Sequence, residues 1–213
     1  MKEIVIIGAR GFAKEFIGYL ENIGDYRIVC ILDELNETEL FGYEIVHPDR
    51  FSGSCRNALL AIGYPYDKKD VCALYSRFDF KWETFIHPMS NVSPYAHIGK
   101  GVMIAPFAVV AGNARIDSFV FINSFASVGH DTIVGSYSSL MPYACVAGRV
   151  SVEETCLLAI GAKVLPGITV HSRSRVSAGV IVTRDIPKDS LVFGNPMQIQ
   201  PDITMIKKTE RKD

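Results

Sequence analysis

The chain has 213 residues, with 22 lysine and arginine residues against 23 aspartate and glutamate residues and a net charge of −1 at pH 7. This length suits one or two domains, and the balanced charge argues against nucleic-acid binding. No apolar run approaches the roughly 20 residues that a membrane-spanning helix needs. We therefore expect a globular protein whose partners include neither a nucleic acid nor a membrane.

The cysteines and the start of the chain indicate the compartment. Cys30, Cys55, Cys72, Cys145 and Cys156 are odd in number and lack metal-binding spacing, which is typical of reduced thiols. The last two fall, by our reading of the pattern described below, at inward positions of a repeat. The apolar part of the N-terminus is too short for a secretory signal and is typical of a strand. We predict a cytoplasmic protein.

Residues 1–84 alternate apolar strands with amphipathic segments, which predicts a small parallel sheet with helices on its faces, a Rossmann-like α/β domain. The predicted strands are Glu3–Ile7, Arg27–Leu32, Asn57–Ile62 and Phe80–Ile86, and the predicted helices are Lys14–Asn22 and Pro65–Arg77. A second domain then covers residues 85–213. The charged run at Lys207–Asp213 is typical of a solvated terminus.

Ligands of such sheets bind at the carboxyl ends of the strands. Gly8–Ala13, Asp33, Glu34 and Gly63 all follow predicted strands, so we expect them to line one crevice. The glycine loop reads G-x-x-G, which is only part of a dinucleotide fingerprint, and a plain strand-to-helix turn is the alternative. Free N–H groups at the helix start suit a phosphate. Asp33 suits a ribose or a base, although it could equally cap a loop.

From Val92 onward an aliphatic residue recurs every six positions, and a small or branched residue follows each one four positions later. The aliphatic series is Val92, Ile98, Ile104, Val110, Ile116, Ile122, Val128, Val134, Leu140, Val146, Val152, Leu158, Val164, Val170, Val176 and Val182. Neither a helix nor an alternating strand has this period, whereas a parallel β-helix of hexapeptide repeats does. A β-sandwich is the alternative, but its uneven strands would break the phase within a few repeats.

Three such hexads close one triangular coil of 18 residues, with both repeated positions pointing inward. Repeat folds need caps and often partners. Phe119, Phe121 and Phe125 occupy positions that we read as outward-facing, which suggests a covered face. We expect a homotrimer.

Three histidines, His97, His130 and His171, fall within the repeats. They lie 33 and 41 residues apart, neither a multiple of 18, so they form no ladder and we predict no metal site. His130 and Asp131 occupy a corner of the middle coils. Gly112 and Gly148, one coil away on each side, should leave the space around the imidazole open.

An imidazole titrates near neutral pH and can take a proton from an attacking nucleophile. Asp131, the next residue, can orient the ring or raise its basicity. An ordinary exposed turn histidine is the alternative reading of His130.

The sequence resembles the two-domain bacterial sugar acyltransferases typified by the bacillosamine-pathway N-acetyltransferase and the sialic-acid O-acetyltransferases. The segments that carry the resemblance are Gly8-Ala9-Arg10-Gly11, Ile86-His87-Pro88, Ser127-Val128-Gly129-His130-Asp131 and Val192-Phe193-Gly194-Asn195-Pro196. It implies a left-handed β-helix, a homotrimer, and acetyl-CoA bound between neighbouring prisms. It also implies that His130 is the general base, assisted by Asp131.

The resemblance further implies a set of binding residues. Contacts to a nucleotide-linked sugar are expected from Arg10, Gly11, Phe12, Asp33, Glu34 and Gly63, and contacts to acetyl-CoA from Ile160 and Ala178. We predict that Ser139 and Gly148 also belong to the acetyl-CoA site. Ser139 stands where the family often has a second histidine, and Arg10 and Phe12 replace a small residue and a histidine of the glycine loop.

We therefore predict an acetyl-CoA-dependent acetyltransferase acting on the amino group of a nucleotide-linked amino sugar in cell-surface polysaccharide biosynthesis. The transfer is predicted to be direct, without an acyl-enzyme and without a metal. An O-acetyltransferase of the sialic-acid type, a longer acyl donor and a non-catalytic ligand-binding trimer are the alternatives. The residues above leave the nucleotide base and the sugar stereochemistry open.

Overall fold

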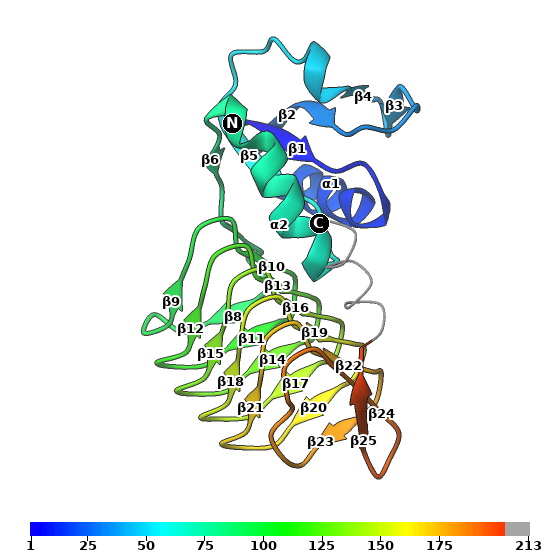
Figure 1. The fold of residues 1–213 in the computed structure, drawn as a ribbon. Coiled ribbons are helices and arrows are strands. Elements are labelled where there is room, and N and C mark those ends of the chain that lie inside the picture. Colours follow the sequence, from blue (N-terminus) through cyan, green and yellow to red (C-terminus); the bar gives the residue numbers. More distant parts are fainter. Residues whose placement is uncertain (203–213) are drawn as a thin grey trace. The chain divides into compact units, whose positions relative to one another are not determined.

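The structure is a computed structural model that describes residues 1–202, so the charged run predicted at Lys207–Asp213 lies outside the described residues. The chain divides into two compact units, Met1–Phe85 and Ile86–Asp213 (Figure 1). Among the described residues no helix is long and apolar enough to cross a membrane.

The first unit is built on one twisted six-stranded sheet with strand order β3-β4-β2-β1-β5-β6. The strands are β1 (Lys2–Ile7), β2 (Tyr26–Leu32), β3 (Glu39–Leu40), β4 (Tyr43–Val46), β5 (Asn57–Leu60) and β6 (Lys81–Trp82). Every pairing is parallel except the β3–β4 hairpin. The helices are α1 (Gly11–Ile23) and α2 (Pro65–Leu74), with 3-10 turns at Pro48–Arg50 and Tyr75–Phe78. The predicted α/β sheet is confirmed.

Helix α1 shows why this segment is helical. Its buried residues Ala13, Phe16, Ile17 and Leu20 recur at intervals of three or four, so one stripe of the helix is apolar. Gly24 ends the helix in the left-handed region at φ 76° and donates its N–H to the Leu20 carbonyl, as glycine at this position commonly does.

For the first unit one prediction was wrong, and one hairpin was missed. The single strand predicted at Phe80–Ile86 is two short strands in different sheets: β6 joins the first sheet, whereas β7 (Phe85–Ile86) begins a sheet of the repeats. The β3–β4 hairpin was not predicted, because each strand is short and half-exposed and shows no long apolar run.

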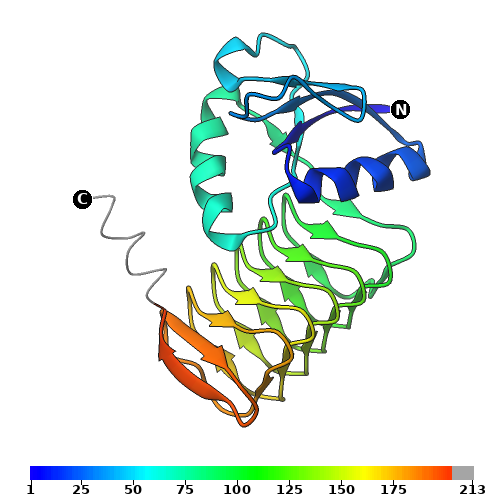
Figure 2. The same ribbon diagram turned by 90° about the vertical axis from the view of Figure 1, so that its right-hand side faces the viewer.

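The second unit is a parallel β-helix whose coils stack in Figures 1 and 2. Sixteen two-residue strands, β8 to β23, each end on a residue of the aliphatic series, from β8 (Asn91–Val92) to β23 (Ile181–Val182). They pair in parallel with partners 18 residues away, as in Phe121 beside Ser139, and they form three sheets with β7, β24 (Ser190–Phe193) and β25 (Gln198–Pro201). The full set of strands between the first and the last is β9 (His97–Ile98), β10 (Met103–Ile104), β11 (Val109–Val110), β12 (Arg115–Ile116), β13 (Phe121–Ile122), β14 (Ser127–Val128), β15 (Ile133–Val134), β16 (Ser139–Leu140), β17 (Cys145–Val146), β18 (Ser151–Val152), β19 (Leu157–Leu158), β20 (Lys163–Val164), β21 (Thr169–Val170) and β22 (Arg175–Val176).

The core of this unit follows the predicted pattern. The aliphatic series and the small residues four positions later form one buried cluster along the axis, from Val102 to Ile186. Inward hydroxyls are satisfied locally: Thr132 donates to the Ala147 carbonyl at 2.7 Å and accepts the Val150 N–H at 3.3 Å. Such bonding is required of a polar group in an apolar core.

Replacing Thr132 by valine should lower the free energy of unfolding by about 1–3 kcal/mol, because the buried Val150 N–H and Ala147 carbonyl lose their partner. Urea unfolding followed by circular dichroism measures the change. Thr183→Val is the matched control, since Thr183 is exposed and should tolerate the change. Equal stability of both variants would contradict the structural role of this hydroxyl.

The predicted outward aromatic cluster is partly wrong. Phe119 and Phe121 are buried, with exposed fractions of 5% and 2%, and Phe119 stacks on Tyr137 with ring centroids 5.4 Å apart. Phe125 is exposed as predicted. It belongs to a column of stacked rings, the aromatic ladder, which consists of Phe107, Phe125 and Tyr143 with centroid distances of 5.0 and 4.9 Å.

Candidate active site

His130 stands at the corner between β14 and β15, and its side chain is 61% exposed. The chain turns there because Asp131 adopts a left-handed backbone conformation at φ 57°. The preceding residue must be Gly129, since a Cβ at that position would lie 2.5 Å from the backbone of Ala147 and Gly148 in the next coil. Gly129 and Asp131 together form a tight corner between closely stacked coils, and the imidazole of His130 extends from this corner into solvent.

His130 and Asp131 form a hydrogen-bonded dyad. The Nδ1 atom of His130 lies 2.7 Å from Oδ2 of Asp131, and the other carboxylate oxygen accepts a hydrogen bond from Nδ2 of Asn113 at 2.6 Å. The bonds from Asn113 and His130 lower the pKa of Asp131. An ionised carboxylate only accepts hydrogen bonds, so Nδ1 of the ring carries a proton, and in the neutral ring the lone pair is therefore on Nε2. The ring is oriented as a proton acceptor.

Asn113 was missed by the sequence reasoning. It precedes Asp131 by 18 residues, which is one full coil, so its contact follows from the same period that predicts the fold.

The prediction that the space on both sides of the imidazole is open was wrong on one side. A Cβ added to Gly148 would lie 2.6 Å from Nε2 of His130, so the ring itself occupies the space over Gly148. A Cβ on Gly112 would meet only Oγ of Ser93, at 3.6 Å. Gly148 therefore serves as a platform for the ring, and the open side faces Gly112.

The residues predicted to contact acetyl-CoA lie in three places. Gly148 adjoins His130. Ser139 is fully buried in β16 and presents no surface to a ligand in the described chain. Ile160 and Ala178 are exposed, one coil apart, at the corner that continues the aromatic ladder. One chain does not bring Ile160 and Ala178 together with His130.

The cysteines are placed differently from each other. Cys156 is buried at an inward position, as predicted, and burial raises the pKa of its thiol to about 12. The inward position predicted for Cys145 was wrong: Cys145 is exposed on β17, one residue before the inward Val146. Alternate residues of a strand point to opposite faces, so the neighbour of an inward residue faces out.

In the first unit the predicted crevice residues meet at the carboxyl edge of the sheet. Gly8 has φ 102°, and a Cβ there would lie 3.1 Å from the Ala61 carbonyl, so glycine is required. The N–H of Ala9 donates to Oδ2 of Asp33 at 2.7 Å. Asp33 thus ties the glycine loop to the end of β2. One carboxylate oxygen of Asp33 therefore caps a loop, which was the alternative to a ligand contact.

The remaining predicted residues frame the start of α1. Arg10 is the exposed residue that precedes the helix, and Gly11 has open space around its Cα. The Phe12 ring lies against Gly63, where an added Cβ would come within 1.9 Å of it. Glu34 is exposed after β2. The loops after β1, β2 and β5 therefore lie together, as expected.

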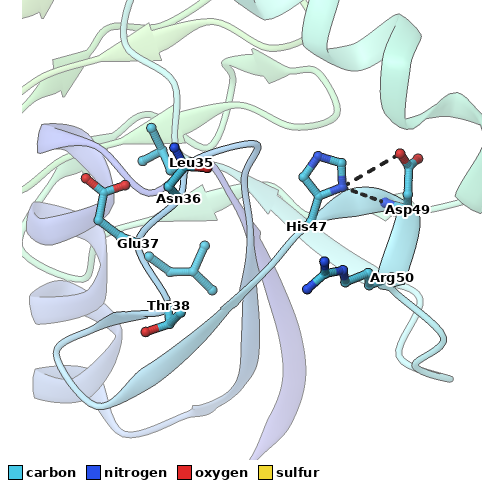
Figure 3. A pocket seen from close by; sticks show the side chains of 8 residues that line it. Leu35, Asn36, Glu37, Thr38, His47, Asp49 and Arg50 are labelled. Carbon is cyan, nitrogen blue, oxygen red and sulfur yellow. Dashed lines mark hydrogen bonds and ion pairs between the residues drawn. The ribbon is translucent and has the colours of Figure 1, made fainter.

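The sequence reasoning missed a cavity of about 430 Å³ on the β4 side of this edge (Figure 3). It lies between the segment that follows β2, Leu35–Thr38, and the segment that follows β4, His47–Arg50. No periodic signal marks it, because its walls are turns. Among residues 1–202, no group of three or more His, Cys, Asp or Glu side chains is arranged to hold a metal ion.

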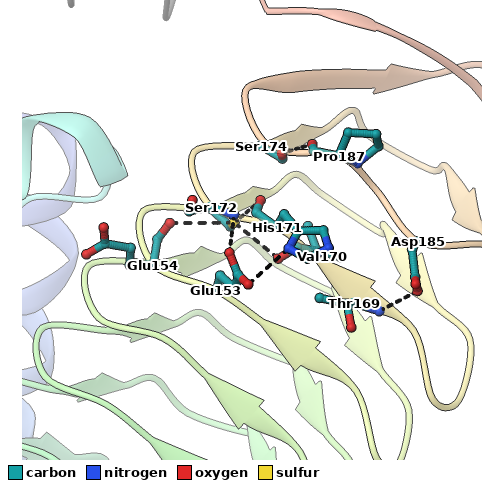
Figure 4. Close-up of polar contacts among 10 residues, drawn as sticks. Glu153, Glu154, Thr169, Val170, His171, Ser172, Ser174, Asp185 and Pro187 are labelled. Atoms are coloured by element: carbon teal, nitrogen blue, oxygen red, sulfur yellow. Dashed lines mark hydrogen bonds and ion pairs between the residues drawn. The ribbon is translucent and has the colours of Figure 1, made fainter.

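A second histidine–carboxylate pair lies at another corner of the repeats. Oε1 of Glu153 lies 3.0 Å from Nδ1 of His171, and Oε2 accepts the Ser172 N–H at 2.8 Å. Figure 4 shows Glu153 turned toward His171 and Ser172, with Glu154 turned away. The Ser172 N–H, followed by His171, lowers the pKa of Glu153.

This pair predicts a pH-dependent contribution to stability. The folded pKa of Glu153 lies below its ordinary value of 4.5, so its stabilising effect is complete above that pH and is lost as the pH falls through the folded pKa. The Tm difference between the wild type and Glu153→Gln should therefore shrink as the pH falls below about 4.5, the ordinary pKa of this carboxyl. Glu154→Gln, at an exposed position, is the control. A Tm difference that is constant across this range would contradict the assignment.

Comparisons with known proteins agree with this arrangement. Residues 3–73 match the family model of the PglD N-terminal domain. GDP-perosamine N-acetyltransferase of Escherichia coli O157:H7 is 27% identical over 172 residues, which cover 76% of this chain and 78% of that protein. PerB from Caulobacter crescentus, in complex with CoA and GDP-perosamine, is 30% identical with a TM-score of 0.87, over 94% of this chain and 98% of that one.

The acetyltransferase domain of PglB from Neisseria gonorrhoeae, in complex with acetyl coenzyme A, is also similar. It is 26% identical with a TM-score of 0.86, over 93% of this chain and 99% of that domain. Both structural matches run through both units of the chain.

An N-terminal α/β sheet domain followed in the chain by a parallel β-helix of hexapeptide repeats places this protein among the hexapeptide-repeat acetyltransferases. The chain belongs to the two-domain bacterial sugar acetyltransferases, the family of PerB and the PglB acetyltransferase domain.

Proposed function

We propose that this chain transfers the acetyl group of acetyl-CoA to the amino group of a nucleotide-linked amino sugar, with His130 as the general base. The observation that carries the proposal is the dyad: Asp131 holds Nδ1 of His130 at 2.7 Å, which leaves Nε2 to accept a proton at an exposed corner. Support comes from the similarity to PerB, which binds CoA and GDP-perosamine, over nearly the whole chain.

In the proposed reaction the neutral amine attacks the thioester carbonyl carbon, which forms the C–N bond and a tetrahedral oxyanion. Nε2 of His130 takes the proton that the nitrogen loses, and the carboxylate of Asp131 stabilises the imidazolium. The oxyanion then collapses, the C–S bond breaks, and the imidazolium returns a proton to the departing thiolate of CoA. The acetyl group passes directly from CoA to the amine, so no acyl-enzyme is formed in this scheme.

The proposal assigns the two units different ligands. Arg10, Gly11, Phe12, Asp33, Glu34 and Gly63 would bind the sugar nucleotide, since they meet at the carboxyl edge of the first sheet. Gly148, Ile160 and Ala178 would bind acetyl-CoA, whereas the burial of Ser139 argues against its direct contact.

We also propose a homotrimer as the active form. Ile160 and Ala178 lie at a different corner from His130 in one chain, so a complete site needs a second copy. The exposed aromatic ladder of Phe107, Phe125 and Tyr143 offers that copy an apolar surface.

Five free thiols support the cytoplasmic location predicted from the sequence.

The test is a panel of sugar nucleotides that carry either an amino group or only hydroxyl groups, with acetyl-CoA as donor and free-thiol release as readout. We expect thiol release with amino sugars, in keeping with the names of the similar N-acetyltransferases. Release with hydroxy sugars alone would favour O-acetylation. Binding of sugar nucleotides without any release would favour a non-catalytic trimer.

A further inference from the structure

The cavity on the β4 side of the first unit has a lining suited to a planar heterocycle. Its volume of about 430 Å³ lies within the range of small-molecule sites. Leu35 and Ile45 contribute half-buried aliphatic side chains, and the remaining lining residues are polar. Figure 3 shows Glu37 on one side and Arg50 on the other, with the Arg50 side chain extending toward the segment that carries Glu37.

The position of the cavity relative to the glycine loop is set by two hydrogen bonds. Ala9 of the glycine loop donates its N–H to the Asp33 carboxylate, and the N–H of Asp33 donates to the Val46 carbonyl at 3.3 Å. The glycine loop, Asp33 and the cavity therefore follow one another across the adjacent strands β1, β2 and β4. In sheets of this kind the phosphates lie at the glycine loop and the ribose lies at the acidic residue after the second strand. A base attached to that ribose would extend toward the cavity.

Two charged side chains in the cavity are not engaged elsewhere. Within residues 1–202, neither the Glu37 carboxylate nor the Arg50 guanidinium makes a hydrogen bond or an ion pair. Asp49 differs, because its carboxylate accepts a hydrogen bond from Arg77 at 2.6 Å, which lowers its pKa. The cavity thus offers a ligand one unengaged carboxylate and one unengaged guanidinium, beside the polar side chains of Asn36, Thr38 and His47.

We propose that this cavity binds the nucleobase of the sugar nucleotide and that its charges select guanine. The inference rests on the proposed function, which it extends by naming the base. Glu37 accepts hydrogen bonds from N1–H and the N2 amino group of guanine, while Arg50 donates to O6 and N7. Leu35 and Ile45 pack against the ring.

Other bases fit this pair of charges less well. Adenine presents an amino group where guanine presents O6, so it would direct a donor at the Arg50 guanidinium. It also lacks the N2 amino group that Glu37 would bind. Uracil has a single ring and would leave part of the cavity empty. Hypoxanthine, the base of inosine, differs from guanine only in lacking the N2 amino group and therefore isolates the contribution of Glu37.

Titration calorimetry with GDP, IDP, ADP and UDP tests the proposal on the full chain. We expect GDP to bind at least about ten-fold more tightly than IDP or ADP, the discrimination typical of a well-formed base contact. Glu37→Gln should weaken GDP more than IDP, and Arg50→Gln should remove the preference for GDP over ADP. Glu44→Gln, an exposed carboxylate on β4 outside the cavity lining, should change none of these affinities.

Equal affinities for GDP, ADP and UDP, or equal losses for all nucleotides in Glu37→Gln, would overturn the assignment of guanine to this cavity. Thiol release with GDP- and UDP-linked amino sugars separates this outcome from failure of the proposed function. Selective GDP binding without thiol release from any amino sugar would support the assignment of guanine to the cavity and contradict the acetyltransferase function. Efficient acetylation of UDP-linked sugars, unchanged in Glu37→Gln, would support the acetyltransferase function and contradict the assignment of guanine.

Discussion

Replacing His130 by alanine should lower kcat for acetyl transfer by roughly 10²–10⁴-fold, the usual contribution of a positioned general base. The physical reason is that the neighbour of the proposed base cannot replace it: Asp131 is held ionised by Asn113 and is a weak base. The measurement is steady-state thiol release at saturating acetyl-CoA and sugar nucleotide.

The fold should survive this substitution, because the His130 side chain is 61% exposed and contributes little to the core. His97→Ala is the matched control, since His97 is an exposed histidine of the same repeats and lies outside the dyad. Thermal unfolding of both variants should match that of the wild type. A folded His130→Ala protein with wild-type turnover would end the assignment of His130 as base.

Replacing Gly148 by alanine should lower kcat by roughly ten- to a hundred-fold, because a new methyl group would displace the ring of His130, the proposed base. The added Cβ would lie 2.6 Å from Nε2 of His130, well inside contact distance, and the ring is the part that can move. Moving it stretches the 2.7 Å bond to Asp131 and misplaces the proton acceptor. Stability should change little, because an exposed side chain absorbs the clash.

Gly112→Ala provides the control from the other side of the ring. Its Cβ would meet only Ser93 at 3.6 Å, so activity should stay near that of the wild type. The KM for acetyl-CoA must be measured in both variants, since Gly148 is also a proposed CoA contact. A loss that appears only in that KM, with kcat unchanged, would contradict displacement of the ring.

The sequence predicts the position of His130 but not the role of Gly148. The corner histidine and its acidic neighbour can be read directly, because the turn of every hexad falls at a fixed place in the period. The sequence predicts open space over Gly148, whereas the ring of His130 occupies that space. The period could not show this, because the rotamer of His130 depends on the bond to Asp131 and not on the repeat.

The same distinction applies to the exposed and buried residues of the second unit. The period correctly predicts the buried inward positions from Val102 to Ile186, because each hexad meets the same steric demand. It does not predict which outward residues become covered, so the burial of Phe119 and Ser139 could be known only from the structure. The exposure of Cys145, by contrast, follows from strand alternation and could have been read from the sequence.

The sequence alone determined the coiled architecture, the preceding α/β sheet and the corner histidine, since each rests on local periodicity or on adjacent residues. The tertiary structure decided the contact of Asn113 with the dyad, the platform under the imidazole and the cavity beside β4. The physical reason is that these features join residues from separate coils or separate turns. The distances between these residues depend on how the backbone segments stack, and a local sequence pattern does not determine that packing.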